Sequence, residues 1–134
     1  MSDECLFCKI IKGEIPSYTL YEDEEILVFL DIFPVSKGHC LLIPKNHYET
    51  IHDVPAKDIV FLSKLPEIAT RMKKITEATG INILQSNGED AGQVIKHIHF
   101  HLIPRFPEDN LIKFPPQSDL EEGIAQDLVE KFRN

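Results

Sequence analysis

Three histidines alternate with apolar residues in the stretch His97-Ile-His-Phe-His-Leu-Ile-Pro104. Period-two alternation predicts a β-strand with one buried face. In such a strand the imidazoles of His97, His99 and His101 point to the same side, with neighbours roughly 6.6 Å apart. A solvated edge strand would also alternate, but its polar positions are normally Thr, Lys or Glu. Three imidazoles on one face therefore make this stretch the first candidate for a functional site.

The chain has 134 residues, a length typical of one domain with a single core. Its net charge of −8 argues against a broad nucleic-acid surface, which needs a basic stripe, but leaves room for a small phosphorylated ligand. No apolar run approaches the roughly 20 residues that span a bilayer, and residues 1–10 do not resemble a signal peptide. We therefore expect a cytoplasmic protein without membrane association. Three cysteines outside a secretory context do not favour structural disulfides.

The secondary-structure signals predict an α+β fold. Short connections between strand-like segments favour an antiparallel meander of about five strands over a parallel sheet. From Asp53 to Gly80, apolar residues recur every three or four positions and predict a long helix packed on this sheet, kinked or restarted at Pro66. Asp53 is its expected cap and Gly80 its expected end. The other expected elements are helices over Phe7–Ile11 and Leu120–Phe132, and strands over Tyr18–Tyr21, Glu25–Leu30, His39–Pro44 and Ile81–Gln85.

Cys5 and Cys8 form a C-x-x-C motif, which by itself has three interpretations. A redox dithiol usually follows a strand and begins a helix in a βαβ unit, and the sequence leaves no room for that strand before Cys5. Half of a zinc site needs two further ligands, which His39, His47, His52 and the three alternating histidines offer. Coincidence is the third interpretation. The motif alone does not decide between them.

A loop over Ser86–Gln93 leads into the histidine stretch and contains Gly88 and Gly92. Glycines let backbone N–H groups approach an anion closely. A plain hairpin connection is the alternative. Next to three histidines, the loop is better interpreted as an anion cradle beside a nucleophile.

Several segments, in order along the chain, carry a resemblance to a known family. The most distinctive runs from Gly88 to Pro104 and is similar to the signature of the histidine triad (HIT) family of nucleotide hydrolases and transferases. The similarity covers residues 5 to about 105 and is strongest to the phosphoramidase-like branch. The other segments are Cys5–Cys8, Phe7–Pro16, Phe29–Ile32 and His39–His47.

The resemblance implies a mechanism. In the family the middle histidine of the triad attacks the α-phosphate of a nucleotide, which makes His99 the nucleophile and gives a covalent nucleotidyl-histidine that water hydrolyses. A neutral imidazole is competent for this attack, and if its Nδ1–H donates to a backbone carbonyl, Nε2 is free to react. His101 is expected to hold the phosphate oxygens, and the backbone of Gly92 and Gln93 to donate hydrogen bonds to them.

The resemblance also implies a site for a purine nucleotide or nucleotide conjugate. Asp31 is expected to bind the ribose hydroxyls, and His39 to support the triad. Many relatives carry Ser or Thr where this chain has Val94, and Ser86 is a candidate to compensate in part for the missing hydroxyl. The apolar slot for the base would consist of Phe7, Ile10, Phe29 and Ile32, which without the resemblance are interpreted as ordinary core residues.

Some relatives with the N-terminal C-x-x-C hold structural zinc, and the resemblance assigns its ligands here to Cys5, Cys8, His47 and His97. This set suits a closed tetrahedral zinc site with no position for substrate. A metal-free pair of thiols is the alternative. Cys40, inside an apolar strand, is expected to be a small core residue. No catalytic metal is expected.

Two other functions fit parts of the sequence. The spacing His97-x-His99 on a strand is also found in zinc hydrolases, in which the metal activates water. That interpretation needs a third ligand from elsewhere and leaves both cysteines unused. A non-catalytic nucleotide-binding or scaffold protein on the same fold is the other alternative.

The expected organisation is one domain over residues 1–134, with a core over 5–105 and a tail over 106–134 that ends in the terminal helix. The resemblance implies a HIT-like fold and a homodimer whose two sheets join. No residue pattern in the chain demonstrates that interface.

Overall fold

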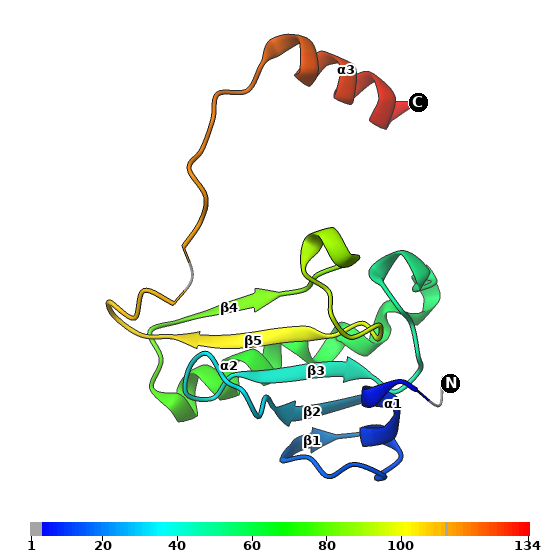
Figure 1. Ribbon diagram of the computed structural model, residues 1–134, viewed down its shortest axis with the longest axis vertical. Coiled ribbons are helices and arrows are strands. Elements are labelled where there is room, and N and C mark those ends of the chain that lie inside the picture. Colours follow the sequence, from blue (N-terminus) through cyan, green and yellow to red (C-terminus); the bar gives the residue numbers. More distant parts are fainter. Residues whose placement is uncertain (1–3, 112) are drawn as a thin grey trace.

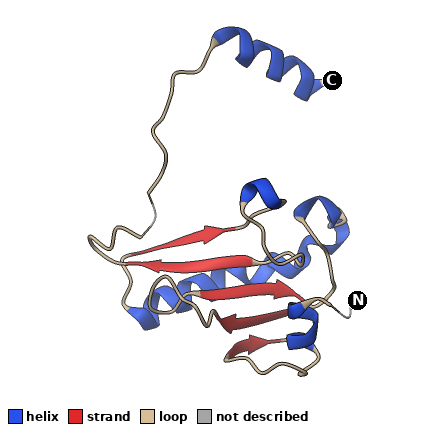
Figure 2. Ribbon diagram, viewed as in Figure 1, coloured by secondary structure: helices blue, strands red, loops and turns tan. Residues whose placement is uncertain are grey.

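The computed structural model describes residues 4–111 and 113–134. Five strands form one antiparallel sheet in the order β1-β2-β3-β5-β4, with helices around it (Figures 1 and 2). The predicted α+β fold with a five-stranded antiparallel sheet is therefore confirmed. The strands are β1 (Thr19–Glu22), β2 (Ile26–Leu30), β3 (Cys40–Pro44), β4 (Gly80–Leu84) and β5 (Phe100–Arg105).

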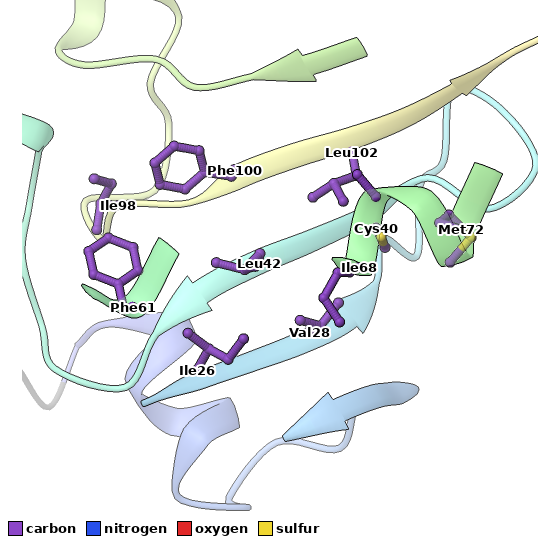
Figure 3. Packing of buried hydrophobic residues seen from close by; sticks show 11 residues of the cluster. Ile26, Val28, Cys40, Leu42, Phe61, Ile68, Met72, Ile98, Phe100 and Leu102 are labelled. Atoms are coloured by element: carbon purple, nitrogen blue, oxygen red, sulfur yellow. The ribbon is translucent and has the colours of Figure 1, made fainter. Parts of the chain in front are cut away.

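Successive side chains of a strand point to opposite faces of the sheet, so the apolar central strands pack against other elements on both faces. Ile26 and Val28 of β2 belong to a cluster that packs against α2 (Leu65–Thr76), while Leu27 and Phe29 belong to a second cluster with α1 (Leu6–Ile11). Figure 3 shows the first cluster, where β2, β3 and β5 meet α2. It includes Ile26, Val28, Cys40, Leu42, Phe61, Ile68, Met72, Ile98, Phe100 and Leu102, so Cys40 is a core residue as expected.

The predicted long helix is divided. Two 3₁₀ segments, η1 (Ile51–Asp53) and η2 (Ala56–Lys64), precede α2, which has Pro66 in its first turn, where a missing N–H costs no hydrogen bond. The expected restart at Pro66 is thus confirmed. The predicted ends are wrong, because Asp53 is the last residue of η1, which Thr50 caps with Asp53 as its capping-box partner, and α2 itself begins at Leu65 without a side-chain cap.

At the other end of α2, Glu77 adopts a left-handed conformation with φ 61° and its N–H bonds back to the carbonyls of Lys73 and Lys74. This cap ends the helix at Thr76, before the predicted stop at Gly80. Gly80 instead opens β4, opposite Arg105.

The histidine stretch is a strand only from Phe100 onward. His97 lies in a bend, and the N–H of Ile98 donates to the carbonyl of Tyr48 at 2.7 Å rather than to a neighbouring strand. The predicted strand beginning at His97 is therefore wrong by three residues. The bend sends His97 to a different environment from His99, which an unbroken strand would not do.

The chain after β5 leaves the sheet. An extended segment carries α3 (Glu122–Arg133) away from the rest of the molecule (Figure 1), and no residue of this helix is buried. The terminal helix was predicted over nearly the same residues. None of the helices in the described parts of the chain has the length and apolar character that crossing a bilayer requires. That all 134 residues form one domain stays a prediction.

Candidate active site

A cavity of about 470 Å³ opens between α1, the end of β2 and the histidine stretch. Its volume lies in the range of small-molecule sites. Nine residues predicted for the nucleotide site line it: Phe7, Ile10, Phe29, Asp31, Ile32, Gly92, Val94, His99 and His101. Ser86, Gln93, His39 and His97 are not among the lining residues.

His99 has its ring fixed in one orientation. Its Nδ1 lies 2.7 Å from the carbonyl oxygen of His97, which can only accept, so Nδ1 carries the proton and donates. Phe7 packs edge-on against the ring, with centroids 5.1 Å apart. Burial lowers the pKa of His99 below its usual value. The result is a neutral imidazole with an unprotonated Nε2 at the cavity, which is the form that acts as a nucleophile.

His101 is the second imidazole of the cavity and has a buried partner. Nε2 of His39 lies 2.9 Å from Nδ1 of His101, so His39 stands beside the triad as expected. Burial, together with the neighbouring His99 and His39, lowers the pKa of His101 to about 4. Asp31 lines the cavity, while its Oδ1 accepts the N–H of Phe33 at 2.8 Å.

The loop before the histidine stretch is braced by the side chain of Gln93. Its Oε1 accepts the N–H of Gly88 at 2.8 Å, and its Nε2 donates to the carbonyls of Glu49 and Ile95 at 2.6 and 3.1 Å. The side chain of Gln93 thus ties the loop to two other backbone segments.

The expected anion donors in this loop are not available in this conformation. The N–H of Gly92 donates to the carbonyl of Glu89 at 2.9 Å, and that of Gln93 to Gly88 at 3.1 Å. The tight turn over η3 (Glu89–Ala91) uses both amides for itself. Ser86 lies outside the cavity lining, so the structure does not support the expected compensation for Val94 either.

Cys5, Cys8, His47 and His97 meet behind the cavity, with their four ligand atoms all within 4.8 Å of one another. Nδ1 of His97 lies 3.4 Å from Sγ of Cys5, 3.6 Å from Sγ of Cys8 and 3.1 Å from Nδ1 of His47. Sγ of Cys8 lies 3.3 Å from Nδ1 of His47. The start of α1, the loop after β3 and the bend at His97 therefore build one compact set of metal-ligating atoms from distant parts of the chain.

The proton of His97 is placed to favour metal binding. Its Nε2 lies 2.9 Å from the carbonyl oxygen of Pro44, so Nε2 donates and Nδ1 keeps its lone pair. Burial lowers the pKa of His97 to about 4, which also leaves Nδ1 unprotonated near neutral pH. A fully buried imidazole whose free lone pair faces two thiols is suited to a metal ligand.

The sequence did not single out the wall formed by the chain after α1. Pro16 and Ser17 line the cavity together with Leu6, Ile15, Leu30, Phe33, Leu41 and Ile95. Leu6 and Phe33 are exposed in the structure, and large apolar residues at the surface often mark a binding site, but exposure cannot be read from the sequence.

Known proteins resemble this chain over most of its length. The HIT domain family matches residues 12–108. The uncharacterized HIT-like protein MJ0866 of Methanocaldococcus jannaschii is 46% identical over 91% of this chain and 97% of its own. The adenosine 5'-monophosphoramidase HNT1 of Saccharomyces cerevisiae is 44% identical over 84% of this chain and 71% of its own. The crystal structure of SMU.412c from Streptococcus mutans matches 99% of this chain and 85% of its own with a TM-score of 0.94 and 39% identity.

Proposed function

The chain belongs to the HIT domain family, and from this premise we propose that it is a nucleotide hydrolase. The substrate would be a nucleoside phosphoramidate or a dinucleoside polyphosphate, attacked at its α-phosphate with a covalent nucleotidyl-His99 as intermediate. The observation that carries the proposal is the hydrogen bond from Nδ1–H of His99 to the carbonyl of His97, which leaves Nε2 unprotonated at the cavity. The relative named adenosine 5'-monophosphoramidase supports the same reaction class.

The cavity divides into a place for the base and a place for the phosphate. Phe7, Ile10 and Phe29 give an apolar slot beside α1 that suits a purine ring, with Ile32 at its edge. Asp31 offers a carboxylate for the ribose hydroxyls. A nucleotide bound in this way would bring its α-phosphate to His99 and His101.

The chemistry then needs two displacements. Nε2 of His99 forms a bond to phosphorus while the bond from phosphorus to the leaving nitrogen or oxygen breaks, and the leaving group departs with the electron pair and takes up a proton from the solvent. Water next attacks the phosphorus and gives up a proton to the solvent, while the bond from phosphorus to Nε2 breaks, which releases the nucleoside monophosphate and returns His99 to its neutral form. Both displacements place negative charge next to His101, which can hydrogen-bond to the phosphate oxygens.

Trapping the intermediate would test this proposal directly. The purified protein is mixed with adenosine phosphoramidate or a dinucleoside polyphosphate, quenched after one turnover in alkali and examined by intact mass spectrometry. We expect an adenylyl adduct on His99. Turnover without any adduct would contradict the covalent mechanism, and a lack of turnover with all purine nucleotide conjugates would favour a non-catalytic binding or scaffold protein instead.

The residue at position 94 should limit the rate. Val94 lines the cavity with a relative exposure of 87%, and its side chain offers no hydrogen bond to a phosphate or a leaving group. We expect Val94→Ser to raise kcat for a nucleoside phosphoramidate about fivefold, the effect of one hydrogen bond of about 1 kcal/mol gained in the transition state. Val94→Ala is the matched control, because it shortens the side chain without adding a hydroxyl. Equal rates for the serine variant and the wild type would contradict the expectation.

A hydrolase with zinc bound by His97 and His99 is less compatible with the geometry. Nδ1 of His97 faces Cys5 and Cys8, and its Nε2 donates to the carbonyl of Pro44. Neither nitrogen is left to share an ion with Nε2 of His99 in the cavity. Activity that disappears on chelation while the fold persists would revive that alternative.

We also propose that Cys5, Cys8, His47 and His97 bind a structural Zn²⁺. Zinc bonds of about 2.0–2.1 Å to nitrogen and 2.3 Å to sulfur set the atoms of a tetrahedron roughly 3.3 to 3.8 Å apart, close to the 3.1–3.6 Å measured between these atoms. Two thiolates and two neutral imidazoles are a donor set that zinc prefers. The ion would link α1 to the chain just before β5 and take no part in the displacement.

A homodimer in the cytoplasm is the proposed state of the protein. β4 is one of the two edge strands of the sheet, because no strand of residues 4–111 or 113–134 pairs with its outer side, and its Ile83 and Leu84 are about half exposed. An open edge of this kind can pair with the same edge of a second copy, which would join the two sheets. A mass in solution equal to that of one chain would contradict the dimer.

A further inference from the structure

The loop before β3 brings a backbone amide to the rear of the active-site histidines. The N–H of Val35 donates to Nδ1 of His39 at 3.1 Å, and Nε2 of His39 lies 2.9 Å from Nδ1 of His101, which lines the cavity. We propose that the Val35 amide is a positioning group, which fixes the proton of His39 on Nε2 and thereby the proton of His101 on its own Nε2. The proton positions follow from the hydrogen bonds alone, and only their use in the reaction rests on the proposed function.

The amide of Val35 determines where His39 carries its proton. A backbone N–H can only donate, so Nδ1 of His39 must accept and cannot carry a proton. A doubly protonated His39 is excluded for the same reason, since two N–H groups would then point at each other. His39 therefore has a single proton, on Nε2.

The position of the proton of His101 depends on which atom accepts the hydrogen bond from Nε2–H of His39. Nδ1 of His101 lies at 2.9 Å, within hydrogen-bonding range, whereas Oδ2 of Asp31 lies at 3.6 Å, beyond it. Nε2–H of His39 thus donates to Nδ1 of His101, which must be unprotonated. The single proton of His101 is then on Nε2, at the side of the ring that remains for the cavity.

The two cavity histidines consequently present opposite groups to a ligand. His99 donates through Nδ1 and offers the lone pair of Nε2, while His101 accepts through Nδ1 and offers Nε2–H. Their ring centroids lie only 5.1 Å apart. In the proposed reaction, the first attacks phosphorus and the second donates to a phosphate oxygen as negative charge builds up there. With its proton on Nδ1, His101 would instead turn a lone pair toward that oxygen and repel it.

The same hydrogen bond should keep metal ions away from this side of the cavity. The ligand atoms of Asp31, His39 and His101 also lie within 4.8 Å of one another. An ion on Nε2 of His39 would force its proton onto Nδ1, against the N–H of Val35. His97 has the reverse arrangement, because its Nε2–H donates to a carbonyl and its Nδ1 is free.

Nuclear magnetic resonance of the protein with ¹⁵N-labelled histidine would read these protons without any substrate. Long-range ¹H–¹⁵N correlations distinguish the two neutral forms of imidazole. We expect Nε2–H on His39 and His101 and Nδ1–H on His99, with the signals of His39 and His101 unchanged by excess Zn²⁺. A proton on Nδ1 of His101, or exchange between its two forms, would overturn the proposal.

A pair of variants at position 35 isolates the amide. Val35→Pro removes the N–H, whereas Val35→Ala keeps it and shortens an exposed side chain. We expect the proline variant to populate both forms of His101 and to lose about tenfold in kcat with KM within twofold, and the alanine variant to match the wild type. A proline variant in which His101 keeps Nε2–H would overturn the proposal.

Variants of His39 give a second measurement if the proline variant does not fold. Glutamine in His39→Gln can still donate an amide hydrogen to His101, and phenylalanine in His39→Phe cannot. We expect His101 to keep Nε2–H in the first variant and to lose it in the second, and the same spectrum in both would overturn the proposal. If the protons are at the expected positions but no nucleotide is turned over, this inference is retained and the proposed function is rejected. If nucleotide is turned over but the protons are at other positions, the proposed function is retained and this inference is rejected.

Discussion

Replacing His99 by alanine should reduce the hydrolysis of adenosine phosphoramidate by at least about 10⁴-fold in kcat, equivalent to about 5 kcal/mol of transition-state stabilisation. The imidazole is the only group that the proposed mechanism uses to bond to phosphorus, and alanine offers nothing in its place. Because His99 accounts for little of the apolar slot, the KM for the nucleotide should change much less than kcat. Steady-state assays with single-turnover controls would measure both quantities.

His52→Ala is the matched control for the loss of an imidazole. His52 is exposed in η1 and lies outside the cavity lining, so its removal should leave kcat within twofold of the wild type. A His99→Ala variant that folds, binds nucleotide and still turns over at more than one hundredth of the wild-type rate would rule out His99 as the nucleophile.

Replacing Cys8 by serine should remove the metal and destabilise the whole fold. We expect the zinc content to fall from about one equivalent to less than about 0.1, and the free energy of unfolding to fall by at least about 3 kcal/mol, or roughly 10 °C in Tm. Hydrolysis should fall as well, because the carbonyl that holds His99 belongs to His97, whose side chain is one of the ligands. Metal analysis of protein purified without added zinc, together with thermal unfolding, would measure these effects.

Cys40→Ala provides the comparison for removing a buried thiol. Cys40 packs in the core and burial raises its pKa to about 12, so it stays a neutral thiol away from the metal set. We expect this variant to keep its zinc and to lose only about 1–2 kcal/mol of stability through lost packing. Equal zinc content in the two variants, or less than half an equivalent in the wild type, would contradict the structural zinc site.

The sequence was sufficient for the sheet because local signals there agree with each other. Continuous apolar runs in β2 and β3, and the proline at the end of β3, indicate strands whose bounds the structure moves by only one residue. The segment before α2 was harder, because apolar residues repeat every three positions in a 3₁₀ helix and nearly as often in an α-helix. Only the hydrogen bonds of the folded chain separate η2 from α2.

In the candidate site, too, some features could be predicted from the sequence and others could not. The resemblance named nine of the residues that line the cavity and the metal-ligating set, since each depends on residue type and order along the chain. The amides of Gly92 and Gln93 could not be judged in this way, because their hydrogen bonds depend on how tightly the loop turns. Likewise, nothing in the local sequence around Val35 indicates that its amide faces a histidine four residues later.

The four metal-ligating residues are synthesised at different times, because they are far apart in the sequence. Cys5 and Cys8 leave the ribosome early, but His97 is the last of the four ligands and lies 92 residues after Cys5 in the chain. A growing chain that lacks His97 would hold only three of the four groups, and it would also lack His99, two residues further. The fourth zinc ligand and the nucleophile would thus be synthesised almost together. A nascent or truncated chain would have neither the complete zinc site without the nucleophile nor the nucleophile without the complete zinc site.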